Sequence, residues 1–286
     1  MPDLKATPGK EPKILFENGK ARVVSHDGSE EIISSLVFNQ RLSQQLIRHY
    51  CGALLHQRFI DKPLPEHEMA DVIDRAVIPL GVVPNRPIIK MMKPEHAELL
   101  TKHGIVRLGS IEYYRRHENP EVQDEAEGYC VLAGFDGEQT HIREVRGGLN
   151  DRILCCYAGP PDWEIVQRFG YDAAVEIINV EAFSLAIGQM IKAKQSIFSS
   201  CIYVRDRAIW GEGLRKVDPQ EMMDGQFSEM LGDARAFLKN NRYQHQSEFR
   251  FVWRGDGHSE VPSQRHCSAI LAKAHVVFLP VCNTRQ

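Results

Sequence analysis

The chain has 286 residues, of which 43% are hydrophobic and 26% are charged, proportions that are ordinary for a soluble globular protein. This length is sufficient for one large domain or two smaller ones with a substantial core. The formal net charge of −3 excludes a global positive field that would attract nucleic acid non-specifically, although it leaves a local basic groove open.

The N-terminal residues and the cysteines indicate the compartment. The opening segment MPDLKATPGKEPK lacks the apolar core of a secretory signal. No apolar run reaches the roughly 18 residues that a membrane-spanning helix requires. The seven cysteines are widely spaced, with no Cys-x-x-Cys pair, and we expect them to be reduced and mostly buried. The sequence therefore predicts a cytoplasmic protein that does not contact membranes.

Residues 1–85 are expected to form an N-terminal piece that is separate from the main domain. After a tail rich in Pro, Gly and Lys, the pair Asn18-Gly19 predicts the turn of a β-hairpin. Apolar residues at helical spacing then predict helices over about 30–59 and 66–78. The proline-rich stretch 79–87 is interpreted as the link to the rest of the chain.

Residues 86–286 are expected to form the main domain, in which short apolar segments are mixed with amphipathic ones. Strands are predicted at 87–91, 105–110, 129–135, 153–157, 174–180, 197–204, 246–251 and 274–281. Helices are predicted from 93 to 103 and over 162–169, 181–195 and 219–240. Because strands and helices do not alternate regularly, we predict an α+β or mixed fold.

The strand predicted at 246–251 carries the most informative pattern in the chain. Polar and apolar residues alternate along it, which is typical of a half-buried strand. Glu248, Arg250 and Gln246 would share one face, because side chains two residues apart on a strand point the same way. Phe249 and Phe251 would point into the core from the other face. The alternative for Glu248 is a purely structural role, in a surface ion pair with Arg250 or with a lysine on a neighbouring strand.

Two further groups of polar side chains lie within apolar strands. Arg107 belongs to the segment IVRLGS, and Ser199-Ser200 belong to IFSSCIYV. A buried arginine usually has an anionic partner, since burying an unpaired charge is unfavourable. Arg107 would therefore either form a structural ion pair, with Glu112 or Asp124 as its partner, or bind an anionic ligand.

An arginine on an early strand, a serine pair on a middle strand and Gln-x-Glu on a late strand resemble the Arg-Ser-Glu class of ADP-ribosyltransferases. The resemblance implies NAD as substrate and a split, mixed and mostly antiparallel β-sheet core with flanking helices, preceded here by the helical N-terminal piece. It implies that Arg107 holds the NAD phosphates or ribose and that Ser199 or Ser200 supports the nicotinamide-ribose pocket. It further implies that Glu248 stabilises the positive sugar as nicotinamide leaves, and that Gln246 helps to select the acceptor.

A second resemblance covers more of the chain. The segment from Lys90 to Gly128 contains Gly-x-x-Arg-x-Gly-Ser and Asp-x-x-Glu-Gly, and it is similar to a family of mostly uncharacterised bacterial domains. These domains also carry a late Tyr-x-x-[Glu/Gln]-x-Glu-x-Arg motif, which the segment from Tyr243 to Arg250 matches. The match spans residues 88–254. In this alignment the middle strand could instead be 153–157, which contains no serine.

These resemblances imply a bacterial toxin or anti-phage effector that ADP-ribosylates a nucleic-acid base or a protein side chain, with an antitoxin or regulatory protein as a further partner. Tyr113, Tyr114 or Trp210 would stack on a ring of NAD, with ordinary core packing as the alternative for each. A non-catalytic binding module and an NAD hydrolase are the competing functions. The acidic run from Asp124 to Gly128 is interpreted as a solvated loop, and no His and Cys spacing predicts a metal site.

Overall fold

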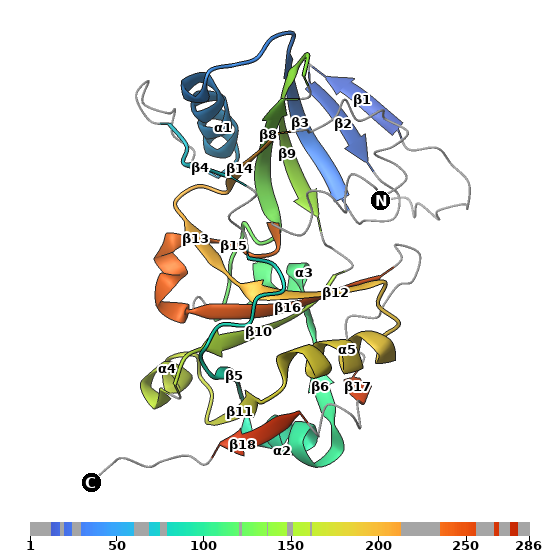
Figure 1. Ribbon diagram of the computed structural model, residues 1–286, viewed down its shortest axis with the longest axis vertical. Coiled ribbons are helices and arrows are strands. Elements are labelled where there is room, and N and C mark those ends of the chain that lie inside the picture. The colour runs from blue at the N-terminus through green and yellow to red at the C-terminus, as the bar shows by residue number, and fades with distance from the viewer. Residues whose placement is uncertain are drawn as a thin grey trace.

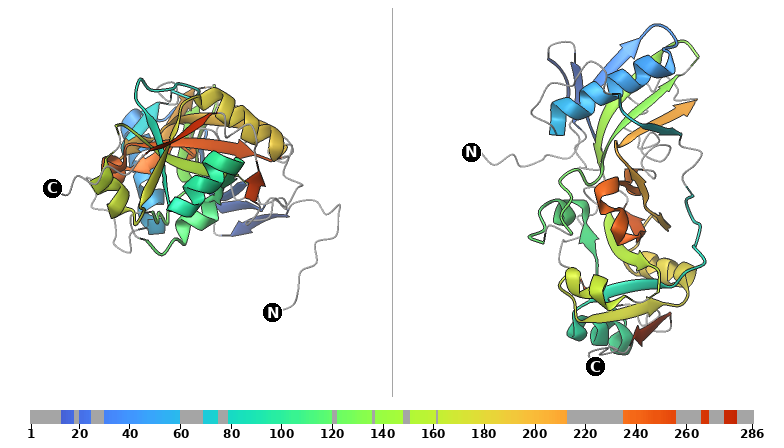
Figure 2. Two further views of the ribbon diagram at one scale, coloured as in Figure 1. Left: turned by 90° about the horizontal axis from the view of Figure 1, so that it is seen from below. Right: turned by 90° about the vertical axis from the view of Figure 1, so that its left-hand side faces the viewer.

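In the computed structural model, the described residues are 13–17, 20–24, 30–59, 69–74, 79–119, 122–135, 137–147, 151–160, 162–212, 235–255, 266–268 and 275–279. They form an elongated molecule with a β-sheet toward each end (Figures 1 and 2). Each of the two sheets has seven strands, and we call them sheet A and sheet B. Chain segments far apart in the sequence pair within both sheets, so neither sheet is a product of local structure alone.

Sheet A has the strand order β1-β2-β3-β9-β8-β14-β4. Its strands are β1 (Lys13–Glu17), β2 (Lys20–Val24), β3 (Glu30–Phe38), β4 (Val72–Asp74), β8 (Tyr129–Phe135), β9 (Thr140–Gly147) and β14 (Ala208–Glu212). Neighbours are antiparallel except at one edge, where β14 runs parallel to both β8 and β4. Helix α1 (Gln44–Phe59) covers one face, burying Ile47, Cys51 and Leu54 against β8 and β9.

Sheet B has the strand order β12-β16-β10-β5-β11-β18, and β7 also pairs with β10. Its strands are β5 (Ile88–Met92), β7 (Gly109–Ser110), β10 (Arg152–Ala158), β11 (Ala173–Ile177), β12 (Gln195–Ser200), β16 (Glu248–Arg254) and β18 (Val276–Leu279). All of these pairings are antiparallel. Strand β16 therefore lies in the interior of the sheet, between β12 and β10.

Helices α2 (Pro94–His103) and α5 (Val180–Met190) pack against one face of sheet B. The core between them and the sheet includes Leu100, Phe183 and the predicted aromatic stripe of Phe249, Phe251 and its neighbour Trp253. The Trp253 Nε1 donates to the Ser184 carbonyl at 2.8 Å. The stripe faces the core as the sequence predicts. The strand is buried on both faces rather than half-buried, because a second core, which includes Val252, packs against its other face.

The helix boundaries follow from capping residues that the sequence shows. Helix α2 begins with Pro94 and ends before Gly104, which adopts a left-handed φ of 69°. Helix α4 (Trp163–Arg168) is capped by the Asp162 carboxylate, which accepts from two backbone N–H groups. Helix α5 is capped by the Asn179 side-chain oxygen, which accepts from the Ala182 N–H. These ends are predictable from the sequence because each depends on one local side chain or glycine.

The α+β class and the mostly antiparallel sheets are confirmed. The expected division near residue 85 does not coincide with a division between the sheets, because β3 pairs with β9 along its whole length. Sheet A thus combines strands from both sides of residue 85. The predicted hairpin is present, with Glu17 opposite Lys20. Its turn residues 18–19 lie outside the described residues.

Three predicted helices differ from the structure. Residues 30–38, expected to be helical, form β3, and α1 begins only at Gln44. Residues 72–74 form β4 rather than part of a helix. The end of the helix predicted at 219–240 is β15 (Leu238–Asn240), and its part before residue 235 lies outside the described residues. In each case, pairing with a distant strand outweighs the local helical pattern.

Candidate active site

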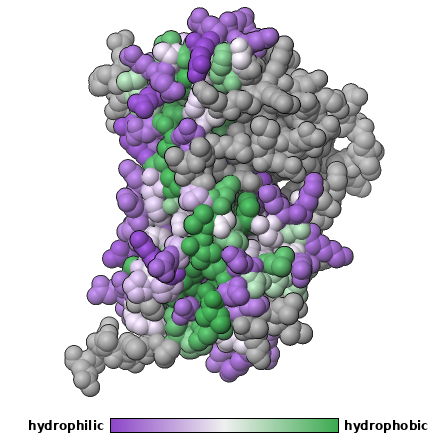
Figure 3. Space-filling view, in the orientation of Figure 1, coloured by the Kyte–Doolittle hydropathy of each residue, from purple (hydrophilic) through white to green (hydrophobic). Residues whose placement is uncertain are grey.

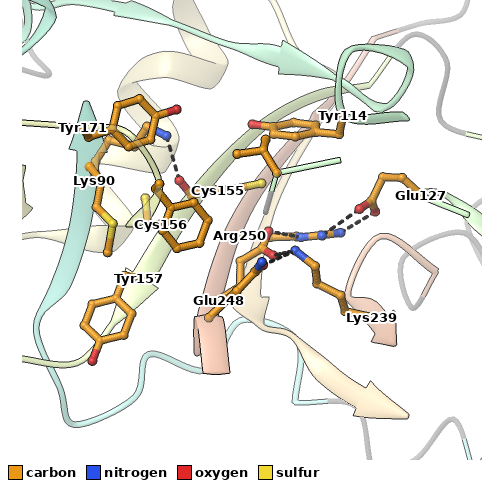
Figure 4. A pocket seen from close by; sticks show the side chains of 14 residues that line it. Lys90, Tyr114, Glu127, Cys155, Cys156, Tyr157, Tyr171, Lys239, Glu248 and Arg250 are labelled. Atoms are coloured by element: carbon orange, nitrogen blue, oxygen red, sulfur yellow. Dashed lines mark hydrogen bonds and ion pairs between the residues drawn. The ribbon is translucent and has the colours of Figure 1, made fainter. Parts of the chain in front are cut away.

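A pocket opens at the face of sheet B that carries Glu248 and Arg250. Its cavity volume is about 70 Å³, and it opens to solvent on one side. Its lining combines charged, aromatic and thiol side chains from β5, β10, β16 and the loops around them (Figure 4). The lining residues are Lys90, Met91, Tyr114, Val122, Glu127, Cys155, Cys156, Tyr157, Phe169, Tyr171, Lys239, Gln246, Glu248 and Arg250.

The backbone holds Glu248 at the point where the chain enters β16. The 3-10 helix η2 (Asn241–Gln246) precedes it, and Ser247 makes the turn in the left-handed region, at φ 40°. The Glu248 N–H donates to the Tyr203 hydroxyl at 2.7 Å. Its carbonyl accepts from the Cys201 N–H at 2.8 Å. The strained backbone of Ser247 and the two hydrogen bonds of the Glu248 backbone fix the direction of the Glu248 side chain.

Glu248 belongs to a buried group of four charged side chains, which we call the charge quartet: Glu127, Lys239, Glu248 and Arg250. One Glu248 oxygen accepts from Arg250 Nε at 2.6 Å, and the other accepts from Lys239 Nζ. The outer end of the Arg250 guanidinium binds Glu127 through two nitrogens, at 2.6 and 2.9 Å. Figure 4 shows the quartet together on one side of the pocket. Two cations and two anions balance one another, as buried charges require.

The pKa of Glu248 lies well below the ordinary value of 4.5. Burial by itself would raise this pKa. The charges of Arg250 and Lys239, with hydrogen bonds from Arg250 and the Cys155 thiol, outweigh burial and favour the ionised form. The pocket therefore presents a carboxylate that is ionised at neutral pH and also under mildly acidic conditions.

This depressed pKa predicts an acid-sensitive contribution to stability. The unfolded chain takes up a proton on Glu248 near pH 4.5 and the folded chain does not, so the stabilisation is complete above that pH and is lost below it. We expect the difference in unfolding free energy between the wild type and Glu248→Gln to shrink by up to about 1.4 kcal/mol per pH unit there. Urea unfolding of both proteins, from about pH 6 down to about pH 3, measures this difference. A difference independent of pH would contradict the prediction.

Gln246 lies in η2 rather than on the strand, which corrects the expected arrangement of three polar side chains on one strand face. It is buried, and its Oε1 accepts from Lys239 Nζ at 2.6 Å. The amide thus helps to place the lysine that contacts Glu248. Gln246 still lines the pocket, so it lies within reach of a bound molecule.

The acidic loop from Asp124 to Gly128 is only partly the solvated loop that its composition suggests, because Glu125 is exposed whereas two of its other acidic side chains are buried. Asp124 and Glu127 are each only 2% exposed. Arg207 donates to Asp124 and to the Ala126 carbonyl. Other contacts of the loop are made by Arg115, whose Nε donates to the Glu127 carbonyl at 2.7 Å, and by Arg250. The loop therefore supplies a rigid wall of the pocket.

The opposite wall carries a lysine among aromatic rings. Lys90 Nζ donates to the Cys155 carbonyl at 2.9 Å. Within the described part of the chain, Lys90 has no ion pair with a carboxylate. Tyr171 lies beside it, and Tyr114 and Tyr157 also line the pocket (Figure 4). The Lys90 ammonium thus provides a positive charge with hydrogen-bond donors to spare. The tyrosine rings of the pocket provide surfaces on which a planar ring can stack.

The predicted grouping of Arg107, Ser199 and Glu248 around one cleft is not formed. Arg107 is exposed on β6 (Ile105–Arg107), and its guanidinium lies 5.5 Å from the centre of the Tyr113 ring. Ser199 is fully buried and donates to the Pro79 carbonyl at 2.9 Å. Ser200 lies opposite Phe249 on β16. None of these residues except Glu248 lines the pocket.

Tyr114, Gln246 and Glu248 are thus the predicted site residues that the fold brings together. The suggested ion pair of Arg107 with Asp124 is wrong, because Asp124 pairs with Arg207. Trp210 is buried under α1 in sheet A, which confirms core packing as its role. Lys90, Glu127 and Lys239 were missed as site residues. For the first two a signal existed, since both lie in the segment that resembles the bacterial domains.

The cysteines in the pocket are protonated thiols at neutral pH. Burial raises the pKa of Cys156 to about 12, and burial together with the nearby charge of Glu248 raises the pKa of Cys155 well above its ordinary value. A nucleophilic cysteine needs a lowered pKa and a positive environment that ionises it. The chemistry of this pocket therefore depends on its carboxylates, lysines and aromatic rings.

A second hollow lies between residues 83–88 and 176–181, and it is wider and more open than the first. The exposed apolar side chains Val83 and Ile178 line it. Figure 3 shows hydrophobic surface gathered in the half of the molecule that contains sheet B. Glu176, Glu181 and Arg86 line this hollow, but none of them is buried, so it lacks the preorganised charges of the first pocket.

Among the residues that the structure describes, no group of three or more His, Cys, Asp or Glu side chains is arranged to hold a metal ion. No helix in the described ranges is both long and apolar enough to cross a membrane. Comparisons with known protein families, with curated proteins and with solved structures find no match. The functional conclusion therefore depends on the chemistry of the pocket itself.

Proposed function

We propose that the protein cleaves the nicotinamide–ribose bond of NAD in this pocket and transfers the ADP-ribose to an acceptor. The observation that carries the proposal is Glu248: a carboxylate ionised by its surroundings, fixed at the start of an interior strand, and facing a pocket with aromatic walls. A lysine without a carboxylate partner completes the arrangement on the other side. The proposed class is that of the ADP-ribosyltransferases, which the sequence resembles.

The arrangement of strands supports this proposal. The resemblance implies three motif strands, early, middle and late in the chain, whose side chains meet at one cleft. Strands β5, β10 and β16 follow one another in that order along the chain and lie side by side in sheet B. Each contributes to the pocket, with Lys90 on β5, Cys155 on β10 and Glu248 on β16. Under this proposal, Lys90 takes the role of holding the NAD phosphates that the resemblance implies for Arg107.

The chemistry of glycosyl transfer suits a paired, ionised glutamate. As nicotinamide leaves, positive charge develops on the ribose, much as in the cleavage of a glycosidic bond. A carboxylate attracts this charge more strongly in the transition state than in neutral ground-state ribose, so it accelerates the step. Because Arg250 and Lys239 keep Glu248 ionised, the charge is in place before the substrate binds.

Lys90 and the tyrosines would bind two different parts of NAD. Under this proposal, the Lys90 ammonium binds a phosphate of NAD as a point charge, in place of the forked contact that an arginine makes. The nicotinamide ring packs against Tyr114 or Tyr157, which line the same pocket. Lys90 would then mainly affect binding, and Glu248 mainly the chemical step.

The test is incubation of the purified protein with NAD labelled in the adenosine part, with and without a bacterial cell extract. Release of nicotinamide together with a labelled nucleic acid or protein is the expected result. Nicotinamide release without a labelled acceptor would identify an NAD hydrolase. Neither release nor labelling would favour the binding module, and would contradict the proposed activity.

Replacing Lys90 by Met is expected to raise the KM for NAD by about tenfold while kcat changes little. Loss of a charged contact to a ligand typically removes about 1.5 kcal/mol or more of binding, and this contact is present in both ground and transition states. Steady-state kinetics of nicotinamide release measure both constants. As a control, Lys102→Met removes an exposed lysine of α2 whose ion pair within the described residues is with Glu98, and both constants should stay at wild-type values. An unchanged KM in Lys90→Met would rule out the assigned role.

A further inference from the structure

We infer that Glu127 is a positioning residue, which sets the place of the Glu248 carboxylate through Arg250. The inference rests on the proposed function and concerns the same pocket. Glu127 lies in the loop between α3 (Ile111–Arg115) and β8, more than a hundred residues before Glu248 in the chain. Its carboxylate is within hydrogen-bond distance of the arginine that binds Glu248, so the two acids are connected through a single guanidinium.

The geometry of Arg250 shows how this connection works. Glu127 accepts from both terminal nitrogens, Nη1 and Nη2, and Nε donates to Glu248. Nη1 also donates to the Ala236 carbonyl at 2.6 Å. The forked contact with Glu127 fixes both the position and the rotation of the guanidinium plane. The hydrogen bond from Nε to Glu248 therefore has a fixed direction.

Without Glu127, the guanidinium plane would lose the forked contact that fixes its rotation. The Nε–H bond would then no longer have a fixed direction, and the Glu248 carboxylate would shift from its place facing the ribose. The site would also gain one net positive charge, which opposes the positive charge that develops in the transition state. Both effects act on the chemical step and leave the contacts of Lys90 with NAD unchanged.

The same loop contains a matched control. Asp124 is as buried as Glu127, at 2% exposed, and it also pairs with a buried arginine, Arg207. Asp124 does not line the pocket, and Arg207 binds the loop rather than Glu248. A purely structural role of the acidic loop would therefore make Asp124→Asn and Glu127→Gln equivalent. A positioning role of Glu127 separates them.

The experiment compares nicotinamide release from NAD by the wild type, Glu127→Gln, Glu127→Asp and Asp124→Asn, with the thermal midpoint of each protein. We expect Glu127→Gln to lower kcat between about 10-fold and 100-fold with KM for NAD unchanged, since a small displacement of a catalytic group has effects of this size. Asp124→Asn should lose thermal stability but keep the wild-type kcat. Glu127→Asp keeps the charge and should give an intermediate kcat. This variant still tests the positioning role if Glu127→Gln does not fold.

Two results would overturn the inference while the proposed function stands: equal kcat values for Glu127→Gln and Asp124→Asn, or a loss in Glu127→Gln that appears only in KM. A wild type that releases no nicotinamide would instead refute the proposed function, and the positioning role would fall with it. The wild-type assay thus separates the two failures. A crystal structure of Glu127→Gln that shows the Arg250 guanidinium rotated and Glu248 displaced, in an otherwise unchanged sheet, is the direct physical result expected.

Discussion

Replacing Glu248 by Gln is expected to lower kcat for nicotinamide release between about 100-fold and 1,000-fold, the range seen when one preorganised electrostatic group is removed from an active site. Gln has nearly the shape of Glu, so the pocket keeps its volume, but no negative charge faces the developing cation. The KM for NAD should change much less, because neutral ribose gains little from the carboxylate in the ground state. Steady-state and single-turnover release of nicotinamide measure both effects.

The matched control for this change is Glu144→Gln. Glu144 is also a buried glutamate on a strand, at 5% exposed, and it accepts from the Tyr129 hydroxyl at 2.8 Å. It belongs to β9 in sheet A and does not line the pocket. Its replacement should affect stability and leave kcat unchanged. If Glu248→Gln releases nicotinamide at the wild-type rate, the catalytic role of Glu248 is contradicted, whatever the control shows.

Replacing Arg250 by Met is expected to destabilise the protein by about 3–5 kcal/mol, the usual result of removing one partner from a buried ion pair. Arg250 is 1% exposed and is the only side chain among the described residues that binds both Glu127 and Glu248. Met fills a similar length without a charge, so the change leaves two buried carboxylates with Lys239 as their only cation in the quartet. Urea unfolding near neutral pH measures the loss.

Arg254 offers a comparison on the same strand. It is 8% exposed, and its Nε is 3.6 Å from Asp151, a longer separation than the 2.6 Å contacts that Arg250 makes with Glu127 and Glu248. We expect Arg254→Met to cost less than Arg250→Met. The double variant Glu127→Gln with Arg250→Met should be less destabilised than the sum of the single variants, because the neutral pair leaves one buried charge fewer. Additive losses would show that the quartet is not coupled.

The parts of the fold that could be predicted are those with a strong local pattern. The strand at 129–135 and the aromatic stripe that includes Phe249 and Phe251 follow from apolar runs and alternation, and both are present as predicted. The ends of α2 and α4 follow from Pro94, Gly104 and Asp162. In each case, the residues that decide the structure are within a few positions of one another.

The parts that could not be predicted depend on distant pairing. The segment EEIISSLVF forms β3 because β9 provides a partner along its length, although its apolar residues also fit a helix. β9 itself and β14 were not predicted. β14 runs parallel to β8, and a pairing between segments so far apart leaves no signal in either one.

The residues of the candidate site are likewise predictable only where they are close together in the sequence. Glu248 was found because Gln-x-Glu-x-Arg is a short motif, and its proximity to Arg250 follows from strand geometry. The expected partner Arg107 was chosen because it interrupts an apolar strand, yet it is exposed and outside the pocket. Glu127 and Lys239 come to Glu248 through tertiary structure, so no spacing along the chain could have assembled the quartet.

The chain passes repeatedly between the two sheets, and this path has a consequence for synthesis on the ribosome. Sheet A lacks β14 until residue 212 has emerged, and β10 and β12 of sheet B lack the strand between them until residue 254 has emerged. An unfinished nascent chain therefore exposes unpaired strand edges, which are prone to pair with other chains. Under the proposed function, translation products that stop before Glu248 cannot consume NAD, so a cell that makes this protein meets its activity only from completed molecules.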